Sequence, residues 1–297
     1  MLPVQRCTFE LEEGPYARRA VHLIDEGPTD APTVVFVHGN PTWSFLWRKV
    51  IAALPEFRCV APDLLGFGLS ARLRSAVDHT IANHTETLVA MTNALVPGPF
   101  IVVGQDWGGP LAVQLARALP DRVRGIVLGN TSVFVPSRPR GSSFHAFARL
   151  PLVSDLAFRG LGFPQNVMWA VQGDRRSIRG RVAKAYRWPL RRPADRVGPL
   201  ALARMVPDGP DHPSMAALRE GGAWLSEFEG PTGLVWGSRD PILGRALRRH
   251  ERELPRAELT VTEAGHFLQE EVPEAIAAAI KSVHARAEAS SSARPPT

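Results

Sequence analysis

The stretch that decides the fold is FIVVGQDWGG, residues 100–109, which leads from an apolar run into a helix-like segment beginning near Pro110. A glycine-bounded turn between a strand and a helix holds its central residue, here Asp106, in a strained conformation above the sheet. A carboxylate is a poor acyl-transfer nucleophile, but it can displace a leaving group at a saturated carbon and leave an alkyl ester. The pattern predicts Asp106 as a nucleophile; the competing interpretation is an ordinary loop, where Asp, Gly and Gln are common.

Short apolar runs alternate with helix-length segments on both sides of this turn. Continuous β-branched runs of such length are typical of buried parallel strands. The expected strands are residues 33–37, 58–61, 100–103, 125–128, 233–236 and 257–261. Between them, segments such as 111–119 and 275–283 have helical spacing. The alternation predicts an α/β fold with a mostly parallel, doubly wound sheet.

The alternation is interrupted between about residues 136 and 211, where Pro, Gly and Arg are frequent. This segment predicts a helical cap inserted after the sixth strand. Ligands bind beyond the carboxyl ends of parallel strands, so the cap would cover the site. We therefore expect an α/β-hydrolase-type core from 1–135 and 212–284, a cap from 136–211, and a disordered tail from 285–297.

Composition narrows the class of protein. A chain of 297 residues with 44% hydrophobic residues suits one large α/β domain with an insertion. No apolar run approaches the ~20 residues that span a bilayer, and the first residues lack the apolar centre of a signal peptide. Cys7 and Cys59 match neither a disulfide framework nor a metal-ligand spacing. We expect a cytoplasmic enzyme with no metal site and no membrane partner.

The net charge of +6 comes mostly from arginine, and the basic residues are densest between Arg175 and Arg196. That stretch lacks a series of aromatic residues for base stacking and matches no nucleic-acid-binding module. A solvated helix face is therefore favoured over a nucleic-acid surface. An Arg-rich cap with exposed apolar residues could also support association of copies into a homo-oligomer.

Uncharged hydrogen-bond donors follow the first of these expected strands and the turn at Asp106. In HGNPTW, residues 38–43, the backbone N–H of Asn40 can supply half of an oxyanion hole, and the N–H of Trp107 the other half. The side chains of the same two residues carry an amide and an indole N–H, which suit a departing halide. An ordinary turn at Asn40 and a packing role for Trp107 are the alternatives.

The last two expected strands are each followed by a candidate partner of the nucleophile. His266 comes after the final strand, where this order of residues places the general base. Asp240 follows the strand before it and would accept the other imidazole N–H, although Asp before Pro is also a common turn pair. Asn130, after the sixth strand, cannot supply the charge, so Asp240 is the predicted acid.

With these residues in place, the chain resembles the haloalkane dehalogenases of the α/β-hydrolase superfamily over roughly residues 27–283. The matching blocks are HGNPTWSFLWR (38–48), APDLLGFGLS (61–70), GQDWGG (104–109) and GHFLQEE (265–271). The resemblance implies Asp106 as nucleophile, His266 as base, Asp240 as acid, and Asn40 with Trp107 as halide donors, most like the third dehalogenase subfamily.

The resemblance also implies the reaction, which turns a small halogenated hydrocarbon and water into a primary alcohol, a halide and a proton without a cofactor. Some relatives use a cap tryptophan as a second halide donor, but Trp169 and Trp188 fall in no matching motif. Epoxide hydrolases share the nucleophile but use a pair of lid tyrosines, and this chain has only Tyr16 and Tyr186. Other activities on the same scaffold, such as a fluoroacetate dehalogenase or a luciferase, and a ligand-binding protein without turnover are further alternatives.

Overall fold

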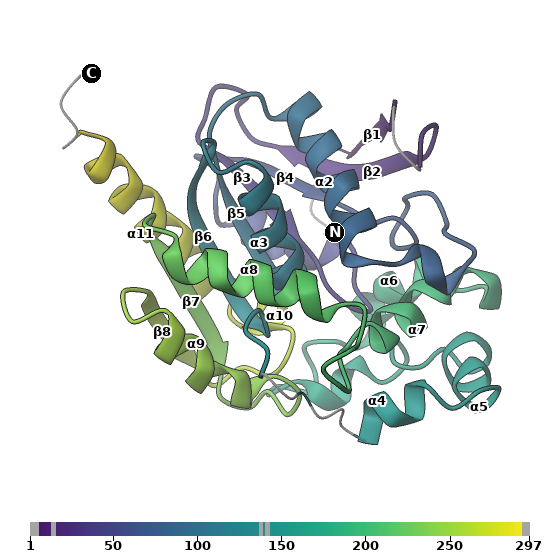
Figure 1. Cartoon of the computed structure of the whole chain (residues 1–297). Helices are drawn as coiled ribbons and strands as arrows, with labels where there is room; N and C mark the ends of the chain where they lie inside the picture. Colours follow the sequence, from purple (N-terminus) through teal and green to yellow (C-terminus); the bar gives the residue numbers. More distant parts are fainter. Residues whose placement is uncertain (1–5, 13–15, 137–138, 140–142, 293–297) are drawn as a thin grey trace.

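The computed structural model describes residues 6–12, 16–136, 139 and 143–292, and its strands form one sheet (Figure 1). The order across the sheet is β1-β2-β4-β3-β5-β6-β7-β8. The strands are β1 (Arg6–Glu10), β2 (Ala20–Glu26), β3 (Thr33–Val37), β4 (Arg58–Pro62), β5 (Phe100–Asp106), β6 (Val123–Thr131), β7 (Thr232–Gly237) and β8 (Glu258–Thr262).

From β4 to β8 all neighbouring strands are parallel, whereas β1, β2 and β4 pair antiparallel. This confirms the predicted fold class, and six of the strands lie where the sequence placed them. The hairpin of β1 and β2 was not among the expected strands. Its first strand alternates between exposed and half-buried residues, so it lacks the continuous apolar run that marks the buried strands.

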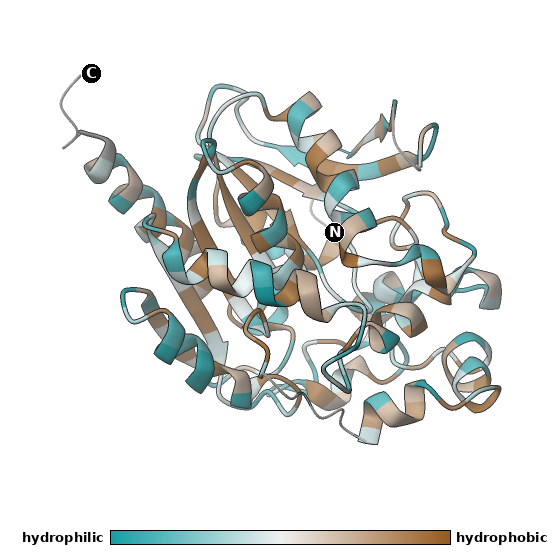
Figure 2. Cartoon of the chain, viewed as in Figure 1, coloured by the Kyte–Doolittle hydropathy of each residue, from teal (hydrophilic) through white to brown (hydrophobic). Residues whose placement is uncertain are grey.

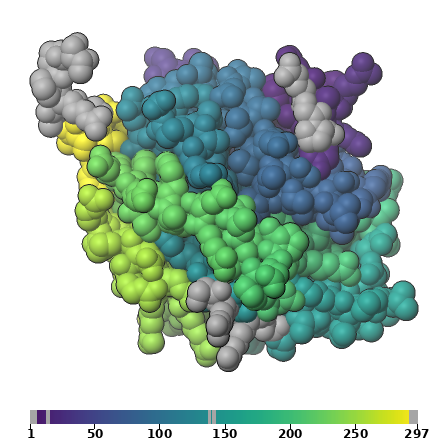
Figure 3. Space-filling model, viewed as in Figure 1, coloured from purple at the N-terminus to yellow at the C-terminus, as the bar shows by residue number. Residues whose placement is uncertain are grey.

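Helices cover both faces of the sheet. Outside the cap segment, the helices and short helical turns are η1 (Ser44–Trp47), α1 (Arg48–Ala52), η2 (Ala76–Asp78), α2 (Ile81–Leu95), α3 (Gly108–Ala118), α8 (Met215–Glu227), η7 (Gly244–Ala246), α9 (Leu247–Glu253), α10 (Leu268–Glu271) and α11 (Pro273–Ser292). One apolar cluster joins the sheet to α2, α3 and α8, and the other joins it to α1 and α11. Figure 3 shows α8 spread across the first of these faces.

Successive side chains of the central strands point to opposite faces, as the pleat of a strand requires. Phe100 and Val102 of β5 belong to the α3 side, whereas Ile101 and Val103 belong to the α11 side. All four are buried. The apolar strands therefore lie between two helical layers. Figure 2 shows these strands as mostly brown ribbons at the centre of the molecule.

The segment 136–211, named here the cap segment, contributes helical elements and, in its described residues, no strand. These elements are α4 (Ser143–Ala148), α5 (Val153–Asp155), η3 (Leu156–Gly160), η4 (Met168–Val171), α6 (Gly180–Arg187), η5 (Trp188–Leu190), η6 (Pro193–Asp195) and α7 (Val197–Arg204). They gather at one end of the sheet, in the lower right of Figure 1.

Helix α11 corrects one expectation. The tail predicted to be disordered from residue 285 is helical as far as Ser292, because α11 continues the run that packs against β6 and β7. Ala287, within that tail, is buried. Residues 293–297 lie outside the described residues. In the part of the chain that the structure describes, no helix has the length and apolar character needed to cross a membrane.

Candidate active site

Asp106 is the last residue of β5, and its backbone has a φ of 53°. This left-handed conformation is uncommon for a residue with a side chain and is typical of a strained functional turn. The turn passes close to β3, since a Cβ atom on Gly108 would lie 1.9 Å from the carbonyl oxygen of Val37. The glycine that follows the turn is therefore required for the helix α3 to begin so close to the sheet.

Two backbone N–H groups hold the carboxylate of Asp106. The N–H of Asn40 donates to Oδ1 at 2.7 Å, and the N–H of Trp107 also bonds the carboxylate. Burial raises the pKa of the Asp106 carboxyl, while His266 and these two donors act in the opposite direction. The predicted oxyanion donors thus converge on the carboxyl group of the predicted nucleophile, Asp106.

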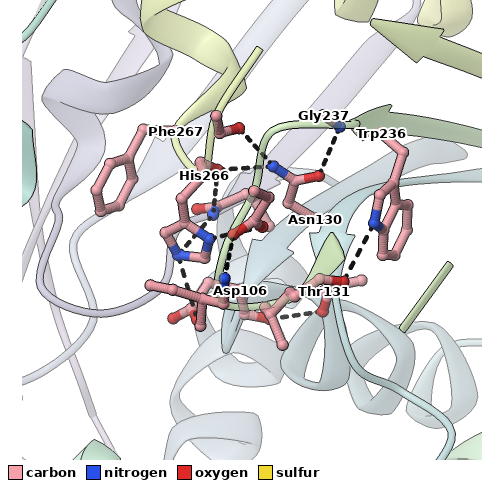
Figure 4. Close-up of polar contacts among 12 residues, drawn as sticks. Asp106, Asn130, Thr131, Trp236, Gly237, His266 and Phe267 are labelled. Carbon is pink, nitrogen blue, oxygen red and sulfur yellow. Dashed lines mark hydrogen bonds and ion pairs between the residues drawn. The ribbon is translucent and has the colours of Figure 1, made fainter. Parts of the chain in front are cut away.

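His266 lies between two carboxylates (Figure 4). Its Nδ1 is 2.9 Å from Oδ2 of Asp240, and its Nε2 is 3.7 Å from Oδ2 of Asp106. Hydrogen bonding to Asp240 assigns the proton of the neutral ring to Nδ1, which leaves Nε2 as the basic atom. Burial opposes the charged ring, but Asp240 and Asp106 outweigh it and raise the pKa of His266 above its ordinary 6.5.

Asp240 lies just after β7, and its side chain is fully buried. Its Oδ2 faces His266, and its Oδ1 accepts the N–H of Ile242 at 2.7 Å. Both oxygens therefore have partners that fix the carboxylate plane. This is the geometry expected of a group that orients an imidazole and stabilises its charged form.

Asn130, at the end of β6, occupies the position where an acid was considered and rejected. It is fully buried and has a φ of 33°. Its Nδ2 donates to the carbonyls of Gly265 at 2.7 Å and His266 at 3.0 Å, and its Oδ1 accepts the N–H of Gly237 at 2.8 Å (Figure 4). The amide therefore ties the ends of β6 and β7 to the loop that carries His266.

The two predicted halide donors differ in their surroundings. Trp107 is 8% exposed and lines a cavity of about 260 Å³ together with Asp106. The Nδ2 of Asn40 donates to the carbonyl of Pro199 in α7 at 3.0 Å. Its Oδ1 is buried and makes no hydrogen bond within the described residues. Since a side-chain amide has two N–H bonds, one remains beyond the contact with Pro199.

The cavity beside Asp106 is lined by residues of the cap segment and by residues outside it. Its lining is mostly apolar, with Ser132 and His145 as the polar side chains besides Asp106 and Trp107. The apolar lining residues are Pro110, Val135, Pro136, Pro139, Val206, Pro207, Leu218, Ile242 and Leu243. Such a cavity suits a small ligand with little polar surface.

The other aromatic residues weighed from the sequence lie away from this cavity. Trp169 and Trp188 of the cap segment are 37% and 53% exposed, and both contact arginines on the surface. Tyr186 is buried, with its hydroxyl 2.5 Å from Oε1 of Glu270. The hydroxyl of Tyr16 donates to the carbonyl of Asp78 at 2.9 Å. None of the four lines the cavity at Asp106.

Three buried residues form hydrogen bonds with the loop that carries His266, and the sequence did not predict these contacts. Gln105 donates to the carbonyl of His266 at 3.1 Å, Asn130 donates to the same oxygen, and Gln172 contacts the backbone of Phe267. Gln105 stands in the turn motif, and Asn130 at a strand end, so position was the available signal. Gln172 lies in a segment with no motif.

Among the described residues, no group of three or more potential ligand side chains could hold a metal ion.

Residues 32–273 match the model of the alpha/beta hydrolase fold. The chain belongs to the α/β-hydrolase family. Among curated proteins, haloalkane dehalogenase 2 of Mycobacterium tuberculosis is 35% identical over 286 residues, covering 93% of this chain and 95% of the relative. This similarity confirms the resemblance to haloalkane dehalogenases drawn from the sequence blocks.

A curated protein with another name and a solved structure are also similar to this chain. The cis-3-alkyl-4-alkyloxetan-2-one decarboxylase of Xanthomonas campestris is 28% identical, covering 88% of this chain and 91% of that protein. Among solved structures, the haloalkane dehalogenase DpaA of Paraglaciecola agarilytica, described as tetrameric, superposes with a TM-score of 0.79. It is 26% identical, and the match covers 94% of this chain and 93% of that one.

Proposed function

We propose that this protein is a haloalkane dehalogenase that hydrolyses a carbon–halogen bond to a primary alcohol and a halide. The observation that carries the proposal is the strained Asp106, held by two N–H groups and facing a His266–Asp240 pair. A carboxylate in this position is suited to displacement at saturated carbon. The similarity to curated dehalogenases over most of the chain supports the same reaction.

In the first step, an oxygen of Asp106 attacks the halogenated carbon, inverting it, as the carbon–halogen bond breaks. The halide leaves with the bonding electron pair. The indole N–H of Trp107 and the free amide N–H of Asn40 stabilise the charge that develops on it. Because both donors are neutral, they do not retain the halide as an ion pair would. The product of this step is an alkyl ester on Asp106.

In the second step, Nε2 of His266 removes a proton from water, and the hydroxide attacks the carboxyl carbon of the ester. The N–H groups of Asn40 and Trp107 stabilise the oxyanion. Collapse of this intermediate breaks the ester carbon–oxygen bond. The departing alkoxide takes the proton of the added hydroxyl, which frees the alcohol and restores the carboxylate. Asp240 stabilises the imidazolium until its proton is lost. The net products are alcohol, halide and one proton, and no cofactor takes part.

The tyrosines argue against the epoxide hydrolase alternative. That chemistry needs a phenol to protonate the departing oxygen, and both Tyr16 and Tyr186 have their hydroxyls bonded elsewhere. Neither lines the cavity at Asp106. A ligand-binding role without turnover would leave the His266–Asp240 pair without a purpose.

An oxetanone decarboxylase is a second candidate, favoured by the 28% identical relative. In a cis-3,4-dialkyl-oxetan-2-one, Asp106 would attack the saturated ring carbon C4 and break its bond to the ring oxygen, so the leaving group would be a carboxylate of the substrate rather than a halide. That carboxylate would then leave as carbon dioxide, while the electron pair of the broken carbon–carbon bond forms an alkene and expels the carboxylate of Asp106. A dialkyl oxetanone therefore belongs in the substrate panel.

Three finer points are part of the proposal. The segment 136–211 acts as a cap over a core of 1–135 and 212–284, and the chain falls in the third dehalogenase subfamily. Association into a homo-oligomer is suggested by the tetramer described for DpaA. Sedimentation velocity at several protein concentrations would test the last point, and a single monomeric species throughout would exclude it.

Halide and proton release from 1-bromoalkanes, 1-iodoalkanes and 1,2-dibromoethane would test the activity. We expect multiple turnovers by the wild type and a loss of at least about 10⁴-fold in Asp106→Ala, since removing a nucleophile costs that much or more. Asp211→Asn, at an exposed aspartate of the cap segment, is the matched control and should keep wild-type turnover. Carbon dioxide release from the oxetanone without halide release from any haloalkane would favour the second candidate instead.

A further inference from the structure

The loop that carries His266 is crossed by the cap segment at very short range. A Cβ atom on Gly265 would lie 2.4 Å from both the nitrogen of Gly173 and the carbonyl oxygen of Val171. A Cβ on Gly173 would lie 3.1 Å from the nitrogen of Gly265. Two glycines thus let the backbone of residues 171–173 pack directly on the backbone of residues 265–267. The cap therefore contacts the loop of the base as well as the substrate cavity.

Hydrogen bonds join the two segments at this crossing. The N–H of His266 donates to the carbonyl of Val171 at 2.8 Å. The buried side chain of Gln172 accepts the N–H of Phe267 on Oε1 at 2.8 Å. Its Nε2 donates to the carbonyl of Phe267 at 3.2 Å and to Oγ of Ser177 at 3.0 Å. These partners assign the orientation of the Gln172 amide. In the reverse orientation an amide N–H of Gln172 would point at the backbone N–H of Phe267.

The core supplies the remaining partners of the loop. The carbonyls of Gly265 and His266 accept from Asn130, and Gln105 adds a second donor to His266. The N–H of Gly265 donates to Glu271 at 3.1 Å. Every backbone N–H and carbonyl from residue 265 to residue 267 thus has a partner. Residues of the core donate to the carbonyls of Gly265 and His266, whereas the cap segment accepts the N–H groups of His266 and Phe267.

We propose that Gln172 is a positioning residue for His266, through which the cap holds the general base in its working geometry. Without Gln172, the buried N–H of Phe267 loses its partner, and the loop relaxes to find another. His266 would then lose its fixed position between Asp240 and Asp106. The kinetic test of this proposal rests on the proposed function. The spectroscopic test depends only on the geometry around His266.

The kinetic consequence is confined to one step. His266 acts on the water that cleaves the ester and takes no part in the displacement of halide. Gln172→Met keeps the volume of the side chain but removes its hydrogen bonds. We expect a rapid release of one halide per active site followed by slow turnover, with kcat lowered about 10- to 100-fold, since small displacements of a catalytic group have effects of this size.

A second buried glutamine provides the control. Gln114 of α3 donates to the carbonyl of Ala217 at 2.5 Å, and it does not line the cavity at Asp106. Gln114→Met makes the same chemical change in the core and should keep the turnover of the wild type without a halide burst. Gln172→Glu retains an acceptor for the N–H of Phe267 but sets a second carboxylate oxygen against the carbonyl of Phe267, so it should recover only part of the lost kcat. Ser177→Ala removes only the bond that orients the Gln172 amide and should reproduce the effect in weaker form.

The low-field proton resonance of Nδ1–H in His266 gives a readout that does not depend on substrate. It should be present in the wild type and Gln114→Met, and shifted or broadened in Gln172→Met. Equal turnover and an unchanged resonance in Gln172→Met and Gln114→Met would overturn the proposal. If Gln172→Met does not fold, the Ser177→Ala variant decides instead: wild-type kinetics and a wild-type resonance in that variant would overturn the proposal. Absence of halide release by the wild type would instead refute the proposed function, and the resonance would still decide the role of Gln172.

Discussion

The core and the cap segment contribute to the site in different ways. The core supplies Asp106, Asp240 and Asn130 at strand ends, where the backbone of the sheet fixes each side chain. The cap reaches the same site through isolated contacts, such as the carbonyl of Pro199 on Asn40 and the side chain of Gln172 on Phe267. The predicted catalytic carboxylates thus lie at or just beyond the ends of strands, and the cap segment makes hydrogen bonds to residues beside the site.

A third contact between the two regions is a buried ionic group. Arg48 of α1 donates to both oxygens of Glu270 in α10, at 2.5 and 2.8 Å. Tyr186 of the cap helix α6 donates to the same carboxylate at 2.5 Å. Burial raises the pKa of Tyr186 well above its ordinary value, and the charge of Glu270 adds to the effect. The phenol therefore stays protonated and joins the cap to the helix that follows the loop of His266.

The largest expected difference between the regions concerns their tryptophans. Trp107→Phe keeps an aromatic side chain but removes the indole N–H. The kcat/KM for 1-bromoalkanes should therefore fall about 10²- to 10³-fold, as for loss of one preorganised donor. Trp169→Phe and Trp188→Phe, in the cap, should leave kcat/KM unchanged. A large loss in either cap variant would show that the cap contributes a halide donor of its own and would break the comparison.

The tyrosines allow a second comparison, on stability. Tyr186→Phe removes a hydrogen bond to a buried charged group and should lower the free energy of unfolding by about 1.5–3 kcal/mol. Tyr16→Phe, whose hydroxyl bonds a backbone carbonyl in the core, should cost only about 1 kcal/mol. Urea unfolding of both variants checks the order. Equal losses would mean that the bond between Tyr186 and Glu270 does not fasten the cap.

The pH dependence of kcat concerns His266, where core and cap meet. The base acts only in its neutral form. In the free enzyme two carboxylates raise its pKa above 6.5, and the charge of Asp240, the larger of the two causes, persists when Asp106 is esterified. Activity should therefore rise with pH through a pKa above that value and fall about tenfold per unit on its acid side. Removing the charge in Asp240→Asn should shift this limb to lower pH. An acid limb below pH 6.5 in the wild type would contradict the arrangement seen around the imidazole.

The sequence predicted the core far better than the cap, and the reason is physical. Asp106, His266 and Asp240 stand at the ends of apolar runs, and the carboxyl ends of parallel strands meet at one edge, so their convergence follows from order alone. The β1–β2 hairpin escaped because one of its strands is half exposed. Gln172 and Pro199 act through contacts with residues far away in sequence. No periodicity or spacing in the sequence indicates such contacts, so they can be identified only in the folded structure.

The covalent ester on Asp106 is the central claim, and one measurement tests it most directly. His266→Gln should complete the first step but not the second, so the variant mixed with 1-bromohexane should accumulate the intermediate. Intact-mass spectrometry should then show one added hexyl group per chain, and peptide mapping should place it on Asp106. Release of halide by the wild type without any adduct in the variant, or an adduct on another residue, would contradict the account.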